Sequence, residues 1–277
     1  MRRQTTWTVT WRTFQVLQIL FLIVSSAAAT SLKVKPESLP ADLRGWLFGV
    51  QSRAWWLILA SSVLAGVCKL VCDGIGPPWV WRSIQKVLDT FRDGAFEIDG
   101  KDGLHKYRVT LFKRCRFAFP MRPGRSPHWP WGKGRHPWSG WLVPLARSGH
   151  TAQKSTTVFL APDDAENAEG IAGKVWAGQW TMMIPNLPDI NKDSVPEMVE
   201  EYAKEAMVPS DWIAWRLLKG KACPRSLCCI SLEVKGEPWG VILLDSAVPS
   251  AINDKRHAWP AYEKLMPLFL GELLKRA

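Results

Sequence analysis

Two long apolar runs dominate the amino-terminal part of the chain. The first covers residues 14–32 and the second covers residues 55–72. Each approaches the roughly 20 apolar residues that a helix needs to cross the hydrocarbon core of a bilayer. Paired tryptophans open the second run, as is typical of a segment that begins at a membrane interface. The pattern therefore predicts that residues 1–73 form a membrane anchor with two transmembrane helices.

The first apolar run permits a second interpretation. Basic residues precede it, and three consecutive alanines, Ala27 to Ala29, lie near its end. A basic start, an apolar middle and small residues are also typical of a signal peptide that is cleaved. Basic residues flank both runs and also lie in the loop between them. Those at the amino terminus and after the second run favour a topology with both ends inside the cell.

A break and an amphipathic segment follow the anchor. Glycines and two consecutive prolines in residues 73–78 interrupt the helical pattern. From Trp79 to Gly94, apolar residues recur on one stripe at helical spacing. We therefore expect a connector helix within residues 74–100. Such a helix either forms the seam of a homodimer or packs on the domain that follows it.

Strand patterns recur through the remaining residues, 101–277. β-branched and aromatic residues predict strands over residues 107–119 and 141–149, and residues 181–187 form a third candidate. The strongest pattern comes late, where residues 226–234 alternate with a period of two. A KGEP turn and the run WGVILLDS follow directly. Together they predict a β-hairpin.

Helical spacing alternates with these strands. It predicts helices over residues 172–179, 194–207 and 259–275. Ser194 and Glu197 have the spacing of a capping box at the start of the second of these helices. Because no regular strand–helix–strand repeat appears, we expect an α+β domain, an antiparallel sheet flanked by helices and preceded by the two transmembrane helices.

Two glycines, Gly170 and Gly173, stand at the start of the short helix. They do not match a dinucleotide-binding fingerprint, because that motif directly follows a strand. Here the acidic segment 163–169 precedes the helix and would repel a phosphate. We expect Gly170 to adopt a positive φ in a turn, and Gly173 to let the helix backbone approach the sheet closely.

Four segments in this order resemble a GAF domain, a small sensory module of signalling proteins. They are residues 141–149, residues 169–179, the hairpin of residues 225–246 and the closing helix, within about Leu104 to Arg276. The resemblance implies an antiparallel sheet with helices on its face and a pocket for a small molecule. Many GAF domains also dimerise through flanking helices. The N-K-F-D-E signature of the members that bind cyclic nucleotides is absent, so the ligand is not identified.

The resemblance also suggests which residues line the pocket. Asp245 and Ser246 end the second strand of the hairpin, although such pairs also occur at strand ends for reasons of turn geometry. Arg147 ends an earlier strand, and two tryptophans lie in or after the short helix. The candidate ligand-binding residues are Arg147, Trp176, Trp180, Asp245 and Ser246.

All of the excess positive charge lies in one segment. Residues 103–162 contain eleven Lys or Arg and no Asp or Glu, whereas the rest of the chain holds 25 basic and 25 acidic residues. A loop in this segment interleaves tryptophans with cations, which suits contact with anionic lipids. Binding of a nucleotide or nucleic acid and a plain surface loop are the alternatives, and nucleic acid is disfavoured. The candidate membrane- or anion-contacting residues are Arg122, Arg125, Trp129, Trp131, Lys133 and Arg135.

Catalytic and metal-binding patterns are weak. The five histidines are scattered, and the six cysteines lack the spacing of a zinc site. We therefore expect no metal, no cofactor and no enzymatic activity. One GAF-like family reduces free methionine sulfoxide with cysteines, and Cys115, Cys223, Cys228 and Cys229 keep that alternative open.

The sequence as a whole predicts a multi-pass protein of the bacterial inner membrane. Its GAF-like domain, residues 101–277, lies in the cytoplasm, binds a small ligand and signals to the membrane segment or to a partner. Membrane lipids, the ligand and a second copy of the chain are the expected partners. In one alternative, ligand binding drives oligomerisation and the hairpins disrupt the membrane, as in some antiviral defence proteins. In the other, the protein is a cysteine-dependent methionine sulfoxide reductase.

Overall fold

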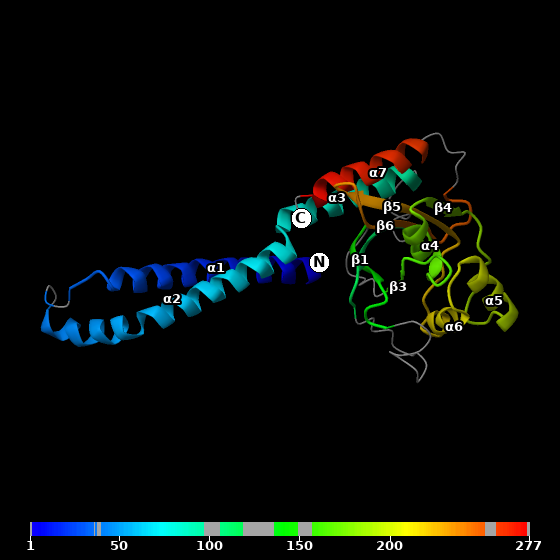
Figure 1. The fold of residues 1–277 in the computed structure, drawn as a ribbon. Helices are drawn as coiled ribbons and strands as arrows, with labels where there is room; N and C mark the ends of the chain where they lie inside the picture. The colour runs from blue at the N-terminus through cyan, green and yellow to red at the C-terminus, as the bar shows by residue number, and fades with distance from the viewer. Residues whose placement is uncertain are drawn as a thin grey trace. The chain divides into compact units, whose positions relative to one another are not determined.

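The computed structural model describes residues 2–35, 37, 40–96, 106–118, 136–148, 157–252 and 259–275. The chain divides into two compact units, residues 1–81 and residues 82–276 (Figure 1). The division falls within the helix that follows the two apolar runs. The first unit is helical, and the second contains all the strands of the described residues.

The first unit is a helical hairpin of α1 (Arg2–Ser31) and α2 (Ala41–Ile75). Small residues such as Ala28 and Ala54 are buried between the helices, which lets the two backbones approach. The Gln51 side chain donates hydrogen bonds to the carbonyl oxygens of Ser31, at 2.7 Å, and Val34, at 2.9 Å. These bonds add a second donor to the Ser31 carbonyl oxygen, which also accepts from the Val34 N–H, and supply a donor to the Val34 carbonyl oxygen just after α1.

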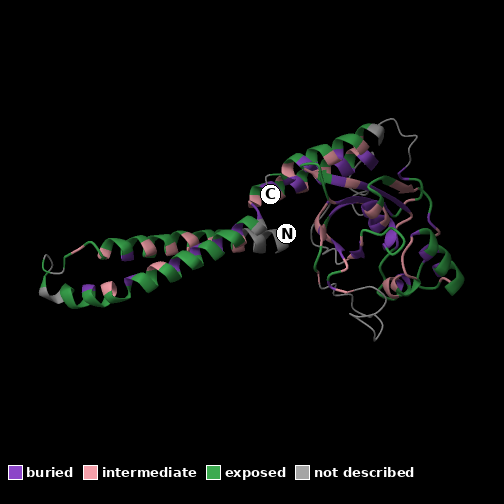
Figure 2. Ribbon diagram, in the orientation of Figure 1, coloured by how far each residue is buried: buried purple, intermediate pink, exposed green. Residues whose placement is uncertain are grey.

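Both helices are long and apolar enough to cross a membrane. One candidate span covers Val9–Ser31, and the other begins at Leu43 in α2. Their outward surfaces are apolar and exposed over most of their length, as the green stretches in Figure 2 show. The two apolar helices predicted over residues 14–32 and 55–72 are therefore present. Each helix is longer than its apolar run, because it begins among the more polar residues that precede that run.

The second unit is built on one antiparallel sheet. Its strands are β1 (Tyr107–Cys115), β2 (Trp141–Arg147), β3 (Phe159–Leu160), β4 (Thr181–Ile184), β5 (Ser226–Val234) and β6 (Glu237–Ser246). Their order across the sheet is β3-β2-β1-β6-β5-β4, and every neighbouring pair is antiparallel. This confirms the predicted α+β class with an antiparallel sheet flanked by helices.

Helices cover both faces of the sheet. On one face lie α4 (Gly170–Gly178), α5 (Pro196–Glu205) and α6 (Ser210–Leu218), whose apolar residues share a core with β5 and β6. On the other lie α3 (Pro78–Phe96) and α7 (Trp259–Leu274), which run together in Figure 1. Cys228 and Cys229 point to opposite faces of β5, yet both are fully buried. Such double burial requires cover on both sides of the strand.

The connector helix predicted from Trp79 to Gly94 is α3, and it packs on the domain. Phe91 contacts the rings of Tyr262 and Phe269 in α7, at centroid distances of 5.9 Å and 6.5 Å. At the end of α3, Phe96 stacks on Tyr107 of β1 at 4.7 Å. The apolar stripe of the sequence therefore faces the domain's own core, and a homodimer seam remains a proposal.

The late hairpin and the two glycines of α4 also follow the prediction. Lys235 and Gly236 join β5 to β6 with φ of 59° and 78°, the left-handed pair that a two-residue hairpin requires. Gly170 has a φ of 66°, as expected of the turn that opens α4. A Cβ atom at Gly173 would lie 2.6 Å from the carbonyl oxygen of Leu160, so α4 presses its backbone against β3 there.

Two expectations about the helices were wrong. The capping box does not form, because Pro196 takes the first helical position and Val195 becomes the N-cap without a side-chain bond. The Ser194 hydroxyl instead accepts a hydrogen bond from the backbone N–H of Asn191 at 2.9 Å. In addition, α5 ends at Glu205, and a separate helix, α6, follows that the sequence had not suggested.

Candidate functional site

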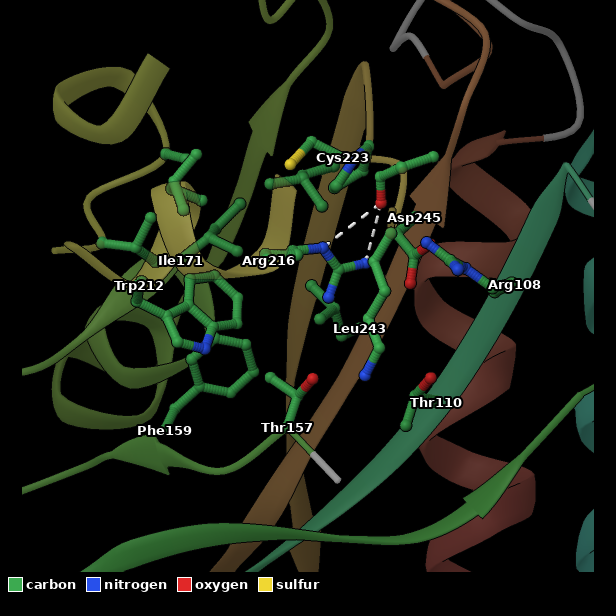
Figure 3. A pocket seen from close by; sticks show the side chains of 18 of the residues that line it. Arg108, Thr110, Thr157, Phe159, Ile171, Trp212, Arg216, Cys223, Leu243 and Asp245 are labelled. Atoms are coloured by element: carbon green, nitrogen blue, oxygen red, sulfur yellow. Dashed lines mark hydrogen bonds and ion pairs between the residues drawn. The ribbon is translucent and has the colours of Figure 1, made fainter. Parts of the chain in front are cut away.

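A cavity of about 530 Å³ lies between the sheet and the helices α4, α5 and α6 that cover one of its faces (Figure 3). Its floor comes from β1, β2, β5 and β6. Its walls come from the helices, from β3 and the residues before it, and from the segment that joins α6 to β5. All its lining residues belong to the second unit. They are Arg108, Thr110, Phe112, Arg147, Thr157, Phe159, Gly170, Ile171, Tyr202, Ala206, Val208, Trp212, Ile213, Arg216, Gly220, Lys221, Ala222, Cys223, Pro224, Leu227, Leu243 and Asp245.

Strand alternation places the floor residues. Arg108, Thr110 and Phe112 are two residues apart on β1 and therefore share one face of the sheet. The antiparallel register sets Asp245 of β6 directly opposite Arg108. It also sets Arg147 of β2 opposite Thr110. Two arginines and one carboxylate thus gather on neighbouring strands.

The Asp245 carboxylate accepts a hydrogen bond from the Arg108 side chain and forms an ion pair with it. Both side chains are mostly buried, with 24% of Arg108 and 12% of Asp245 exposed. Arg147 makes no ion pair with any residue that the structure describes. Burial lowers the pKa of Arg147, and repulsion from Arg108 lowers it further, while Asp245 acts in the opposite direction. Two arginines face one carboxylate here, so this end of the cavity carries a net positive charge.

A third guanidinium reaches the cavity from α6. Arg216 donates to the carbonyl oxygen of Ala222 through Nε at 3.2 Å and through Nη2 at 2.9 Å, shown as dashed lines in Figure 3. The same group lies over the ring of Trp212, with its Cζ 5.7 Å from the ring centroid. These contacts fix the orientation of a side chain that would otherwise be mobile.

Aromatic side chains form the opposite side of the cavity. Phe159 packs edge-on against Trp212, with 6.3 Å between ring centroids, and against Phe112 at 5.5 Å. In Figure 3 the rings of Phe159 and Trp212 and the side chain of Ile171 lie on the side away from Arg108 and Asp245. The cavity therefore has an apolar side and a charged side, as small-molecule sites commonly do.

Two groups that could react are held in their neutral forms. The Tyr202 hydroxyl donates a hydrogen bond to the Pro224 carbonyl oxygen at 2.8 Å, and burial raises the pKa of Tyr202 far above its usual value. Burial also raises the pKa of the Cys223 thiol, against a smaller opposing effect of Arg216. A raised pKa leaves little thiolate, and the thiolate is the nucleophile. Among the described residues there is no cluster of metal-ligating side chains.

The structure brings two of the five candidate ligand-binding residues into the cavity, Arg147 and Asp245. Ser246 is fully buried, is not a lining residue, and accepts a hydrogen bond from the backbone N–H of Val248 at 2.9 Å. It follows Asp245 on β6, so its side chain points to the opposite face. Trp176 packs under the Arg114 guanidinium, 5.2 Å from its ring, and Trp180 is 53% exposed; neither lines the cavity.

Sequence reasoning missed several residues that the cavity uses. Arg108 and Thr110 carried a usable signal, because a polar pair spaced by two within a β strand must share a face. The signal for Arg216 and Trp212 was weaker, because the sequence did not predict α6, the helix that carries them. The candidate membrane-contacting residues Arg122, Arg125, Trp129, Trp131, Lys133 and Arg135 lie outside the described residues.

The antiparallel sheet, the helices packed on it and the cavity beneath α4 to α6 are what the resemblance to GAF domains implies. The second unit is GAF-like in fold. No protein-family model and no curated protein matches the chain. Several solved structures are similar to the GAF-like domain in outline.

Three of these structures illustrate the extent of the similarity. A fragment of a methyl-accepting chemotaxis protein is 19% identical, covers 71% of this chain and 95% of its own, and gives a TM-score of 0.37. A GAF domain region from Geobacter sulfurreducens is 12% identical, with 71% of this chain and 94% of that one covered and a TM-score of 0.34. A free methionine-R-sulfoxide reductase from Thermoplasma acidophilum is 15% identical, with 70% of this chain and 94% of that one covered and a TM-score of 0.35. At these values no ligand or reaction of those proteins transfers to this chain.

Proposed function

We propose that the protein is a membrane-anchored sensor whose GAF-like domain binds a small ligand and passes the change to the membrane hairpin or to a partner. The observation that carries this proposal is the cavity of about 530 Å³ beneath α4 to α6. Its volume lies within the roughly 300–1,000 Å³ of ligand pockets, and apolar walls combine there with a few convergent polar groups.

A route for the signal supports the proposal. Only Gly76 and Pro77 separate the end of α2 from the start of α3. The Gln85 side chain of α3 donates a hydrogen bond to the backbone carbonyl oxygen of Arg147, whose side chain lines the cavity. A ligand that shifts the end of β2 therefore acts on the helix that continues from the anchor.

Cysteine chemistry and charge support a cytoplasmic domain at the inner membrane. All six cysteines are free, which suits a reducing compartment. Basic residues at the amino terminus and after the second apolar run favour both chain ends inside the cell. Membrane lipids are the proposed partners of the cationic tryptophan loop, residues 120–140.

The test is to purify the full chain in lipid nanodiscs and to identify small molecules that it retains by native mass spectrometry. We expect a molecule of defined mass that is lost when Ile171→Trp fills the cavity. The matched control, Trp180→Phe, alters an exposed aromatic residue outside the cavity. Retention of the same molecule by the filled variant would show that the cavity is not the binding site.

The same preparation separates the sensor from its two alternatives. Ligand-dependent leakage of dye from liposomes would identify a membrane-disrupting effector. Turnover of free methionine sulfoxide that is lost when Cys115, Cys223, Cys228 and Cys229 become serine would identify a reductase. The structure offers the reductase little support, because Cys223 is the one cysteine among the lining residues and its thiol has a raised pKa.

A further inference from the structure

The cavity holds more positive charge than its own carboxylate can neutralise. Four cationic side chains line it, from β1, β2, α6 and the segment after α6: Arg108, Arg147, Arg216 and Lys221. Asp245 is the acidic residue among the lining residues, and it is already paired with Arg108. Holding the other cations together in a partly buried site costs free energy, because like charges repel more strongly where the dielectric constant is low. A bound anion would offset this cost.

Two guanidinium groups outside the Arg108–Asp245 pair line the cavity, and such groups recognise planar and tetrahedral anions. Arg147 is carried by β2, and its Cα is paired with that of Thr110 in the sheet, so its backbone is held rigidly. Arg216 uses Nε and Nη2 to hold the Ala222 carbonyl oxygen, which leaves other N–H donors of the group. Guanidinium groups fixed in this way bind carboxylates and phosphates through paired hydrogen bonds.

The rest of the cavity requires that the anion carry an apolar body. An inorganic ion would leave most of the 530 Å³ unfilled, including the surface of Phe159, Trp212 and Ile171. Phe159 and Trp212 meet edge-to-face, and such rings favour contact with a further flat or aromatic group. Figure 3 shows them across the cavity from Arg108 and Asp245, with Arg216 between the two sides.

We infer that the cavity binds a small organic anion, in which a carboxylate or phosphate group is attached to an apolar body about the size of an aromatic ring. The anionic group binds Arg147 and Arg216, and the body packs against Phe159 and Trp212. This inference rests on the proposed function, since it names the class of ligand for the same cavity. A soluble metabolite and the headgroup end of a phospholipid share this chemistry.

The test compares three probes by isothermal titration calorimetry on the full chain in phosphatidylcholine nanodiscs. Phenyl phosphate combines both features, inorganic phosphate has the charge alone, and benzyl alcohol has the ring alone. We expect phenyl phosphate to bind about tenfold or more tightly than either of the others, because each lacks one set of contacts. Equal binding of phenyl phosphate and benzyl alcohol would overturn the inference.

Variants assign the effect to the cavity. Arg147→Gln should weaken phenyl phosphate about tenfold or more, because it removes a charged hydrogen-bond donor, and should leave benzyl alcohol nearly unchanged. Arg82→Gln makes the same change on an exposed position of α3 outside the cavity and should alter neither affinity. Should Arg147→Gln fail to fold, Arg216→Gln removes the other proposed contact to the anionic group and must still weaken phenyl phosphate alone. Unchanged affinity in a folded variant contradicts the inference.

A further arm distinguishes the two sources of the anion. Dioctanoyl phosphatidic acid that competes with phenyl phosphate, and does so through Arg147, identifies a lipid as the ligand source. Competition by phenyl phosphate analogues without competition by the lipid identifies a soluble metabolite. If neutral molecules alone bind, the anion inference fails while the sensor proposal stands. If no probe binds and no molecule is retained on purification, the proposed function fails as well.

Discussion

The Gln85 side chain of α3 donates a hydrogen bond to the backbone carbonyl oxygen of Arg147, at the end of β2. One partner belongs to α3, the helix that follows the helical hairpin, and the side chain of the other lines the cavity. The bond therefore lies within the second unit and ties α3 to the end of β2. We expect its removal to lower the free energy of unfolding and to speed hydrogen exchange at the end of β2.

Gln85→Ala should lower the free energy of unfolding by about 1 kcal/mol, because one hydrogen bond is lost and the carbonyl is left partly buried. Hydrogen exchange at the end of β2 should become faster. Lys86→Ala, at the exposed neighbouring position of α3, should affect neither quantity. Urea unfolding and exchange mass spectrometry of the detergent-solubilised full chain check both expectations. Equal effects of the two substitutions would show that the Gln85 bond adds nothing.

Asp245→Asn removes the carboxylate that compensates Arg108. We expect a loss of about 2–3 kcal/mol in the free energy of unfolding, because a mostly buried cation loses its partner next to Arg147. The double variant Arg108→Gln with Asp245→Asn should recover part of this loss. Thermal unfolding of the two single variants and the double variant gives the coupling energy, and strictly additive losses would contradict the pairing.

Gly173→Ala should destabilise the domain by about 1–3 kcal/mol, the usual cost of forcing extra volume into a packed site. The added Cβ would lie 2.6 Å from the Leu160 carbonyl oxygen, and a backbone atom of β3 cannot move aside as a flexible side chain can. Gly45→Ala is the matched control, since no atom lies within 4 Å of a Cβ there. Chemical denaturation compares the two, and a neutral Gly173→Ala would mean that α4 does not press on the sheet.

Acid should remove a stabilising contribution of Asp164. Hydrogen bonds from the Glu166 backbone N–H, at 2.9 Å, and from the Asn167 side chain, at 2.6 Å, lower the pKa of the Asp164 carboxyl. A lowered pKa in the folded state means that the contribution is complete above the unfolded pKa of about 3.9 and is lost as pH falls through the folded pKa. Asp164→Asn should therefore differ from the natural protein at pH 6 and converge with it in strong acid.

Unfolding curves of both proteins between pH 6 and pH 2 measure this convergence. The variant Asn167→Ala removes one donor and should narrow the difference at pH 6. A difference between Asp164→Asn and the natural protein that does not change with pH would show that the carboxyl's charge is not involved.

Local patterns predicted the parts of the fold that local forces determine. The β5–β6 hairpin followed from strict alternation and from two turn residues, Lys235 and Gly236, that adopt left-handed conformations. The two apolar helices and α3 followed from their composition and periodicity. By contrast, α6 is nine residues long and begins directly after Pro209, so its period is too short to stand out.

The cavity could be predicted only in part, because its chemistry depends on pairs that are distant in sequence. Arg108 and Asp245 are 137 residues apart and meet only through the strand register. Trp176 shows the converse difficulty, since the sequence places it on α4 but does not give the rotation of that helix about its axis. The structure turns its ring toward Arg114 and away from the cavity.

The short junction between α2 and α3 has a mechanical consequence. Gly76 and Pro77 are the residues between the two helices, and a proline ring locks its own φ. Two residues span about 7 Å at full extension, so there is almost no slack to absorb a displacement. A displacement at the end of α2 is therefore passed to the start of α3 instead of being taken up by a flexible linker.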